Sequence, residues 1–330
     1  MVRLSHDRIG RLRDTPGATA LLFITDRCPV GCAHCSVDSR PDSPRITDFA
    51  LFEQIVDRLC ADPGYQIVGI SGGEPFIERR ALTYATRRLH EAGKQAVVYT
   101  SGFWGKAGDP PPWIHQVLDH CAAVYLSTDA YHEAGTGPGP FVDAARAVAA
   151  HGLPIVVQVV ADRGMPERAA DLLHQAFGSG WREHAEVVPT PGLDHGRGAE
   201  IYHRETRSPG RALGHCTLVN APVVRYDGRV AVCCNESVLM GGGPAALRRD
   251  CADAEAVGEA LADFRQDPLY RAIGSVDSSV LTRLPVFGDL ADREFSTICG
   301  LCWAMTRRVG ASGESGTVLR SLGILTGGTA

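Results

Sequence analysis

The sequence predicts an α/β fold built on a parallel β-sheet. Six short apolar runs alternate along the chain with five segments whose apolar residues recur at helical spacing. The runs are continuous rather than alternately apolar and polar, which is typical of parallel strands that helices cover on both faces. Periodicity alone fits a doubly wound sheet and a barrel equally well, because both repeat strand and helix in the same order.

The predicted elements follow one another from residue 20 to residue 188. The strands are expected at 20–24, 67–70, 96–100, 124–127, 155–160 and 185–188. The helices are expected at 47–60, 78–92, 113–121, 141–150 and 166–177. Thr47 is the expected N-cap of the first helix, and Gly93 is the expected stop of the second. The Gly-Pro run at 135–140 is predicted as a flexible connection before the fourth helix.

Composition narrows the class of protein. The chain has 330 residues, of which 44% are hydrophobic and 22% are charged, as in ordinary globular proteins. Its net charge is −5 and its basic residues are scattered, which argues against a nucleic-acid partner. The apolar runs are too short to span a bilayer, and residues 1–19 lack the apolar core of a secretory signal. A cytoplasmic protein with no membrane partner is therefore expected.

The eleven cysteines point to metal or redox chemistry, because cytoplasmic thiols are kept reduced. Cys60, Cys121 and Cys251 stand alone in the sequence and are expected to be ordinary buried thiols. The other eight fall into two groups, 28/32/35 and 216/233/234/299/302.

The first group follows the first strand with the spacing C-x3-C-x2-C, at Cys28, Cys32 and Cys35. Three thiolates on one loop can hold three corners of a cubane iron–sulfur cluster and leave the fourth iron open to a small molecule. Spacing alone leaves two alternatives, a zinc site with His34 as its fourth ligand and disulfide pairing.

The second group lies near a predicted β-hairpin. Asp227-Gly228 between apolar stretches is a strong turn signal, so Cys216 and Cys233 are expected to flank the hairpin. Cys299 and Cys302 form a C-x2-C pair, whose spacing lets one turn present both sulfurs to one metal site. Together these four thiols predict a second metal site, for which a zinc knuckle is the alternative.

The order of two motifs resembles the radical S-adenosylmethionine (SAM) superfamily. The cysteine loop follows the first strand, and Ser71-Gly72-Gly73-Glu74-Pro75 follows the second. The resemblance implies a partial (β/α)6 barrel, with its active site at the carboxyl ends of the strands. It also implies that the three cysteines bind a [4Fe-4S] cluster and that SAM chelates the open iron. His34 stands where an aromatic residue near the adenine is common in that family.

The same resemblance implies the SAM contacts. The GGE segment would contact the methionine amine, and Ser127 and Asp129 match by position the residues that hold the ribose. The expected SAM contacts are His34, Gly72, Gly73, Glu74, Ser127, Asp129 and Gln158. The alternatives are a tight turn for the two glycines and a satisfied core amide for Gln158. Asp129, Tyr131 and His132 are candidate catalytic residues, with a solvated loop as the alternative reading for Tyr131 and His132.

The C-terminal cysteines resemble a SPASM or "twitch" auxiliary-cluster domain. The Gly-x4-Cys register from Gly228 selects Cys233, and Cys234 is its substitute, because neighbouring side chains on a strand point to opposite faces. The implied cofactor is a second [4Fe-4S] cluster, held by Cys216, Cys233, Cys299 and Cys302, that acts as an electron relay.

The expected organisation has four parts along the chain. They are an N-terminal extension at 1–19, the barrel at 20–195, the auxiliary-cluster domain at 196–306, and a tail at 307–330. Within the third part, helices are expected near 254–265 and 268–275. The tail is rich in Gly and Ser and is predicted to be partly ordered.

The resemblance implies reductive cleavage of SAM to a 5′-deoxyadenosyl radical that abstracts a substrate hydrogen, with an external electron donor of the flavodoxin or ferredoxin type. The expected substrate is a ribosomally made peptide, modified by crosslinking or epimerisation. Only 19 residues precede the first strand, so a separate protein would then supply peptide recognition. The alternatives are a dehydrogenase of an aminocyclitol-like alcohol and a zinc-stapled protein without enzymatic activity.

Overall fold

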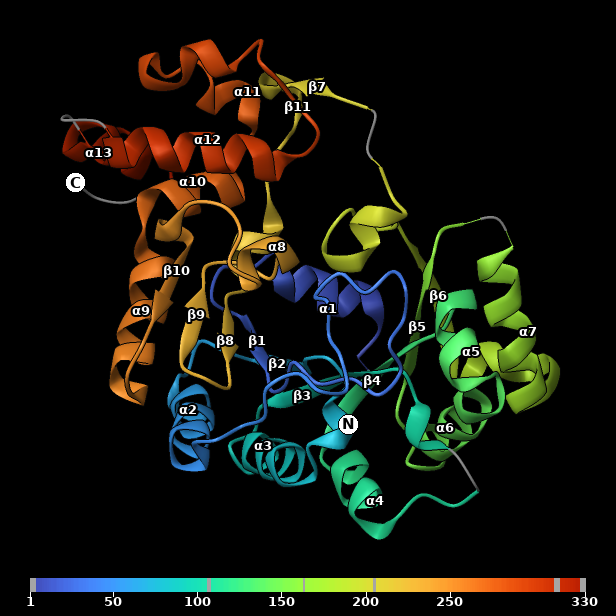
Figure 1. The fold of residues 1–330 in the computed structure, drawn as a ribbon. Helices are drawn as coiled ribbons and strands as arrows, with labels where there is room; N and C mark the ends of the chain where they lie inside the picture. The colour runs from blue at the N-terminus through green and yellow to red at the C-terminus, as the bar shows by residue number, and fades with distance from the viewer. Residues whose placement is uncertain (1–3, 106–107, 163, 204–205, 312–314, 327–330) are drawn as a thin grey trace.

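A nine-stranded sheet organises the protein. The computed structural model describes residues 4–105, 108–162, 164–203, 206–311 and 315–326. The strands of the main sheet are β1 (Thr19–Phe23), β2 (Ile67–Ser71), β3 (Gln95–Thr100), β4 (Cys121–Ser127), β5 (Ile155–Val160), β6 (Ala185–Thr190), β8 (Val223–Arg225), β9 (Arg229–Ala231) and β10 (Arg248–Asp250). Their order is β10-β9-β8-β1-β2-β3-β4-β5-β6 (Figure 1). A separate pair joins β7 (Ser208–Pro209) to β11 (Glu294–Phe295).

The order of the strands decides between the doubly wound sheet and the barrel, which the sequence periodicity fits equally well. Each of β1 to β6 pairs in parallel with the next strand in sequence. A doubly wound sheet would reverse its strand order at one point, which this sheet does not do. The predicted partial (β/α)6 barrel is therefore confirmed.

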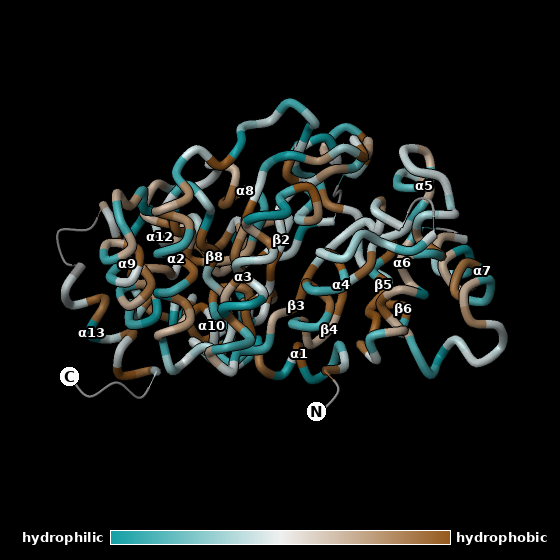
Figure 2. Tube along the Cα trace, turned by 90° about the horizontal axis from the view of Figure 1, so that it is seen from below, coloured by the Kyte–Doolittle hydropathy of each residue, from teal (hydrophilic) through white to brown (hydrophobic). Residues whose placement is uncertain are grey.

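Helices cover the outer face of the barrel. They are α2 (Phe49–Ala61), α3 (Arg79–Glu91), α4 (Pro112–Asp119), α6 (Gly139–Ala150) and α7 (Met165–Phe177). The short helix α5 (Ala130–Thr136) instead lies against the cysteine loop, where Tyr131 stacks on His34. Figure 2 shows apolar residues along β3 to β6 and a mixture of apolar and polar residues along the helices, as expected when each helix buries one side. All the predicted strands and helices of the barrel form, with their ends shifted by a few residues.

Two local predictions in the barrel were wrong. The side chain of Asp48, not that of Thr47, caps α2 by accepting a hydrogen bond from the Leu51 amide at 2.9 Å. Helix α5 occupies a stretch in which no helix was predicted, because Asp129 caps it by accepting from the Tyr131 and His132 amides, both at 2.9 Å. A single capping side chain thus decides where each of these short helices begins.

Helix α1 (His6–Arg13) lies within the stretch expected to be a plain extension. Its residue Ile9 packs against Val97 and Tyr125 on the inner face of the sheet. The ring of His6 also hydrogen-bonds the Tyr125 hydroxyl, with 2.9 Å between Nδ1 and the oxygen. Helix α1 therefore closes part of the barrel interior.

The C-terminal half adds a meander and a helical group to the free edge of β1. Strand β8 pairs in parallel with β1, and β8 and β9 form the predicted hairpin around Asp227-Gly228. The helices of this half are α8 (Glu236–Leu239), α9 (Ala254–Gln266), α10 (Pro268–Ser275), α11 (Ser278–Leu281), α12 (Ile298–Ala311) and α13 (Ser315–Leu325). None of the helices in the described ranges combines the length and the apolar character needed to cross a bilayer.

The C-terminal stretch is more regular than its composition predicted. Helix α12 runs through residue 311, and α13 follows where a partly ordered tail was expected. Leu322 is fully buried, and α13 packs against α10 and α12. The apolar positions of α13 thus find a partner surface that composition alone does not reveal.

Candidate active site

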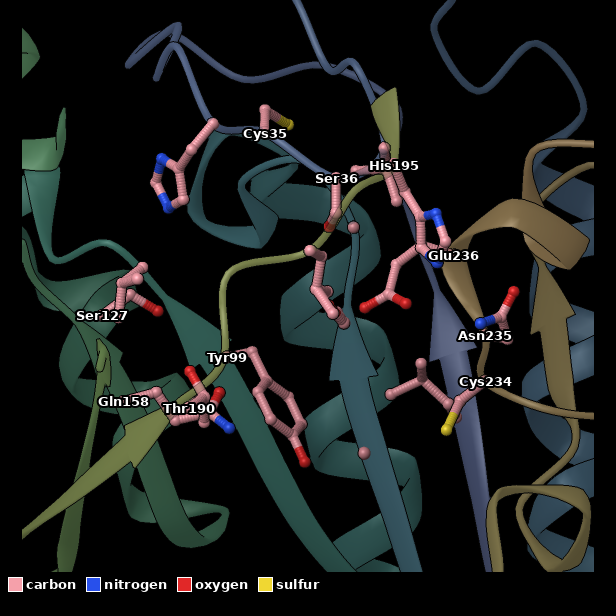
Figure 3. A pocket seen from close by; sticks show the side chains of 18 of the residues that line it. Cys35, Ser36, Tyr99, Ser127, Gln158, Thr190, His195, Cys234, Asn235 and Glu236 are labelled. Carbon is pink, nitrogen blue, oxygen red and sulfur yellow. The ribbon is translucent and has the colours of Figure 1, made fainter. Parts of the chain in front are cut away.

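A cavity of about 640 Å³ opens at the carboxyl ends of the barrel strands. Its walls come from both halves of the chain. The three-cysteine loop and the ends of β2 to β5 form one side, and residues 234–236 with 297–299 form the other (Figure 3). The cavity therefore lies between the two cysteine groups that the sequence singles out.

All three cysteines of the first group line this cavity. Cys28 and Cys32 are buried and pack with Phe103 and Tyr131, whereas Cys35 is partly exposed. Burial raises the pKa of Cys28 to about 12. Within the described ranges, no disulfide joins any two of the eleven cysteines.

Gly72 and Gly73 bring the end of β2 against the backbone of the cysteine loop. The Gly73 amide donates to the Thr25 carbonyl at 2.7 Å, and the Glu74 amide donates to the Arg27 carbonyl at 2.8 Å. A Cβ atom at Gly72 would lie 2.6 Å from the Thr25 oxygen, and one at Gly73 would lie 2.3 Å from the Arg27 oxygen. Both positions require glycine because the two backbones touch.

Glu74 serves the framework in this structure. Its carboxylate is buried and does not line the cavity. It accepts hydrogen bonds from the Thr100 hydroxyl at 2.8 Å, the Ser101 hydroxyl at 2.6 Å, and the Ser101 and Phe76 amides at 2.9 and 3.1 Å. Burial raises its pKa, although these hydrogen bonds oppose the shift. Its role as a SAM contact stays a prediction.

Asp129 and two histidines form a compact cluster beside the cysteine loop. His34 Nε2 lies 3.2 Å from one carboxylate oxygen of Asp129, and His132 Nδ1 lies 2.9 Å from the other. Burial by itself would raise the pKa of Asp129, but the hydrogen bonds from His132 and His34 outweigh it and lower the pKa. The His34 ring stacks on Tyr131 with 4.8 Å between centroids. Asp129 thus already has partners on both oxygens.

The other expected SAM contacts lie on the cavity wall. Ser127 and Gln158 are paired across β4 and β5 and line the cavity. Figure 3 shows both side chains on the same wall as Thr190, opposite the wall that carries Glu236. Within the described part of the chain, no hydrogen bond is found for the side chain of either Ser127 or Gln158, and the Nδ1 atom of His34 also has no partner.

The second cysteine group gathers around the end of the hairpin. Burial raises the pKa of Cys233 well above its ordinary value, and the neighbouring thiols Cys234, Cys302 and Cys216 add to that shift. Burial likewise raises the pKa of Cys302 to about 12, with Cys216 and Cys299 contributing. Unlike Cys233 and Cys302, Cys234 lines the cavity. Burial raises its pKa as well, but the nearby charge of Arg13 opposes that shift.

Within the described ranges, one set of donor side chains is close enough together to surround a single ion. It consists of His34, Asp129 and His132, whose ligand atoms lie within 4.8 Å of one another. His34, the expected fourth ligand of a zinc site, instead contacts Asp129.

Several cavity residues were missed from the sequence, and three of them are polar residues from the segments after β6 and β9. They are His195, Arg197 and Glu236. Glu236 is half-buried and lines the cavity, and no other side chain within the described ranges pairs with its carboxylate (Figure 3). Burial raises its pKa, and His195 opposes that shift. No local pattern marks these residues, because long-range folding brings them to the cavity.

Comparison with known proteins agrees with the barrel. Residues 22–176 match the family model described as the Radical SAM superfamily. The fold resembles that of SuiB from Streptococcus suis, also solved bound to S-adenosylmethionine, with a TM-score of 0.51 and 13% identity over 82% of this chain and 70% of that one. This likeness concerns the fold alone.

Two curated relatives match parts of the chain. The "Putative peptide biosynthesis protein YydG" of Bacillus subtilis (strain 168) is 24% identical over 116 residues, which cover 34% of this chain and 36% of YydG. The "PqqA peptide cyclase" of Streptomyces rochei is 27% identical over 237 residues, which cover 66% of this chain and 63% of the cyclase. The chain thus spans about a third of the length of YydG and less than two thirds of the length of the cyclase.

Proposed function

Because residues 22–176 match the family model of the Radical SAM superfamily, we propose that the protein is an enzyme that cleaves SAM reductively and abstracts a hydrogen atom from a peptide. One observation carries the proposal. Cys28, Cys32 and Cys35 and the glycines after β2 line one cavity, and Cys234 and Cys299 of the second cysteine group line the same cavity. A substrate between them would meet both redox sites.

The residues present suit the cofactors of such a domain. Cys28, Cys32 and Cys35 would hold a [4Fe-4S] cluster, and Gly72 and Gly73 leave backbone exposed beside it for the methionine end of SAM. Ser127, Gln158 and His34 line the cavity where they can meet the ribose and adenine. When bound, the cluster and SAM supply a 5′-deoxyadenosyl radical, and this radical chemistry belongs to the cofactor rather than to the protein.

The protein's own contribution is positioning and exclusion of water. The strand ends fix the SAM contacts, while α1 closes part of the barrel interior. Holding a substrate C–H beside the reactive carbon can supply about 7–11 kcal/mol of the barrier in favourable cases. Glu236 faces the cavity without a side-chain partner, so we assign it to the substrate. There it can accept a hydrogen bond or a proton from an N–H or O–H group.

We propose that Cys216, Cys233, Cys299 and Cys302 hold a second [4Fe-4S] cluster of the SPASM or twitch kind. The hairpin that separates Cys216 from Cys233 and the C-x2-C spacing of Cys299 and Cys302 support this set. Cys233 is favoured over Cys234 by the Gly-x4-Cys register from Gly228. A fully ligated cluster suits electron relay.

The names of two relatives favour a peptide substrate. One is called a peptide biosynthesis protein and the other a peptide cyclase, although neither is matched over two thirds of its length. Crosslinking and epimerisation are both compatible with the cavity. An external one-electron donor and a separate peptide-recognition protein complete the proposal.

The test is anaerobic incubation of the reconstituted enzyme with SAM, a low-potential reductant and peptides encoded beside its gene. We expect 5′-deoxyadenosine together with a peptide that either loses two hydrogens or, in heavy water, gains one deuterium. Loss of two hydrogens indicates oxidative crosslinking, and deuterium uptake indicates epimerisation. The Cys60→Ala variant, which changes a single thiol outside the cavity, should behave like the parent.

Two results would overturn the proposal. Turnover of an aminocyclitol-like alcohol with no change in any peptide would assign the enzyme to small-molecule oxidation. Stoichiometric zinc with no release of 5′-deoxyadenosine would assign it to the non-enzymatic class.

A further inference from the structure

Arg197 ties the segment after β6 to the three-cysteine loop. Its Nε and Nη2 atoms both donate to the Cys32 carbonyl, at 3.0 and 2.8 Å. Its Nη1 donates to the Asp38 carboxylate at 2.6 Å and to the Ser39 carbonyl at 3.1 Å, and its backbone amide donates to the Cys35 carbonyl at 3.0 Å. One residue therefore holds the loop at two of its three cysteines and at the residues that follow.

The backbone around Arg197 is shaped for this contact. Gly196 has a φ of +55°, and a Cβ atom there would lie 2.5 Å from the Cys35 oxygen. A Cβ atom at Gly198 would lie 2.3 Å from the Leu193 oxygen and 3.0 Å from the His34 oxygen. Larger residues at either position would push the segment away, so the glycines on both sides of Arg197 permit the close approach.

The loop itself includes a conformation that needs support. Asp38 has a φ of +50° and is the single non-glycine residue with a positive φ in the described part of the chain. Arg197 and Arg40 both pair with its carboxylate, at 2.6 and 2.9 Å. The left-handed backbone at Asp38 is thus held from two sides, and one of them is Arg197.

We propose that Arg197 is a positioning residue for the cluster site, which fixes the backbone at Cys32 and Cys35 and holds a positive charge beside those ligands. The inference rests on the proposed function, because it assigns the loop to a cluster. The same segment, 191–195, also lines the cavity, so Arg197 links the cavity wall to the sulfur ligands.

The geometric and electrostatic effects of Arg197 can be separated by two substitutions. A guanidinium donates in a fixed planar fork, which a lysine ammonium cannot reproduce, so Arg197→Lys keeps the charge and loses the fork. Arg197→Gln removes the charge and retains part of the hydrogen bonding. Because reduction adds negative charge to a cluster, a nearby cation raises its reduction potential.

The experiment uses the full chain, reconstituted anaerobically with iron and sulfide. The cluster signal is followed by electron paramagnetic resonance during a redox titration, with and without SAM. In parallel, metal-free protein is treated with iodoacetamide, and the alkylation rates of Cys32 and Cys35 are mapped by mass spectrometry. Arg146→Gln is the matched control, because Arg146 also bridges two backbone carbonyls, those of Ala176 and Gln175, outside the cavity.

We expect Arg197→Gln to shift the midpoint potential to lower values, Arg197→Lys to keep it near that of the parent, and Arg146→Gln to leave it unchanged. Both Arg197 variants should alkylate Cys32 and Cys35 about ten-fold faster, the equivalent of one lost charge-assisted hydrogen bond. An unchanged potential in Arg197→Gln, or unchanged alkylation in both variants, would overturn the inference. If the parent binds no iron, the proposed function fails, while the alkylation rates still decide whether Arg197 holds the loop.

Discussion

Arg225 and Asp26 form a two-point ion pair that joins the hairpin to the base of the cysteine loop. Arg225 Nη1 lies 3.0 Å from Asp26 Oδ1, and Nη2 lies 2.7 Å from Oδ2. The Tyr226 hydroxyl donates to the same carboxylate at 2.8 Å. The two charged side chains are 7% and 13% exposed. Asp26 lies just before Cys28, and Arg225 ends the first strand of the hairpin that leads to Cys233. The ion pair therefore connects the chain segments that carry the two cysteine groups.

Replacing Arg225 should therefore destabilise the protein strongly. Arg225→Gln leaves the buried Asp26 carboxylate without its cation, which costs about 3–5 kcal/mol of unfolding free energy. Urea unfolding of the metal-free protein measures the loss. The control is Arg211→Gln, which breaks an exposed pair with Asp292 and should cost less than about 1 kcal/mol. Equal losses of unfolding free energy in the two variants would show that the buried pair stabilises the protein no more than an exposed pair does.

Asp62 provides a test of pH dependence away from the cysteines. Arg265 Nη2 lies 2.8 Å from one Asp62 oxygen, and the Gly64 amide donates to the other at 2.8 Å. Burial would raise the pKa of Asp62, but these contacts outweigh it and lower the pKa below the ordinary value of 3.8.

Because the pKa of Asp62 is lower in the folded protein than in the unfolded chain, its carboxylate stabilises the folded state at pH values above the unfolded-state pKa. Compared with Asp62→Asn, the parent should therefore be more stable at neutral pH, and the difference should shrink as the pH falls below 3.8. Unfolding free energies of both proteins across acidic pH check this. A difference that grows as the pH falls would contradict the assigned sign.

Gly73→Ala tests the contact between β2 and the cysteine loop. The added methyl group would overlap the Arg27 carbonyl, so we expect a loss of about 1–3 kcal/mol and a marked fall in iron bound per chain. Gly139→Ala in α6 is the control, because no atom lies near its Cβ position and its φ is not positive. Normal iron binding by Gly73→Ala would show that the loop tolerates displacement.

Glu236→Gln tests the substrate side of the cavity. If Glu236 takes a proton from the substrate, product formation should fall about 10²–10⁴-fold, and more 5′-deoxyadenosine should form per product. In the parent, product formation should fall as the pH drops through a pKa raised above 4.5, because the base must be ionised. Glu259→Gln on the exposed side of α9 is the control. An unchanged product ratio and pH profile would remove Glu236 from the proposal.

The sequence predicts the barrel well because its strands are long apolar runs. The run of Ile155–Val160, for example, forms β5 with the predicted ends. The sequence predicts the start of a helix and the shortest helices less well, because one side chain decides them, as Asp48 does for the start of α2 and Asp129 does for α5. Helix α1 escapes prediction because its apolar residues are few and pack against distant partners such as Tyr125. Helix α13 escapes prediction because its apolar residues pack against α10 and α12, which no local pattern reveals.

The site likewise contains features that the sequence predicts and features that it does not. Cysteine spacing and the GGE segment are local patterns, and the three cysteines line one cavity with Gly72 and Gly73. The roles of Glu74 and Arg197 depend on residues far away in the chain, namely Ser101 and Cys32. A sequence can suggest which chemistry is present, whereas a carboxylate that is already fully hydrogen-bonded is visible only in the folded protein.

The most direct test of the central claim is a count of iron in the parent and in a variant with Cys28, Cys32 and Cys35 all changed to Ala. With two cubanes, the parent should hold roughly eight irons per chain and the variant roughly four. The parent should also release 5′-deoxyadenosine from SAM under reducing conditions, and the variant should release none. A variant that keeps all of the parent's iron, or still cleaves SAM, would contradict the account.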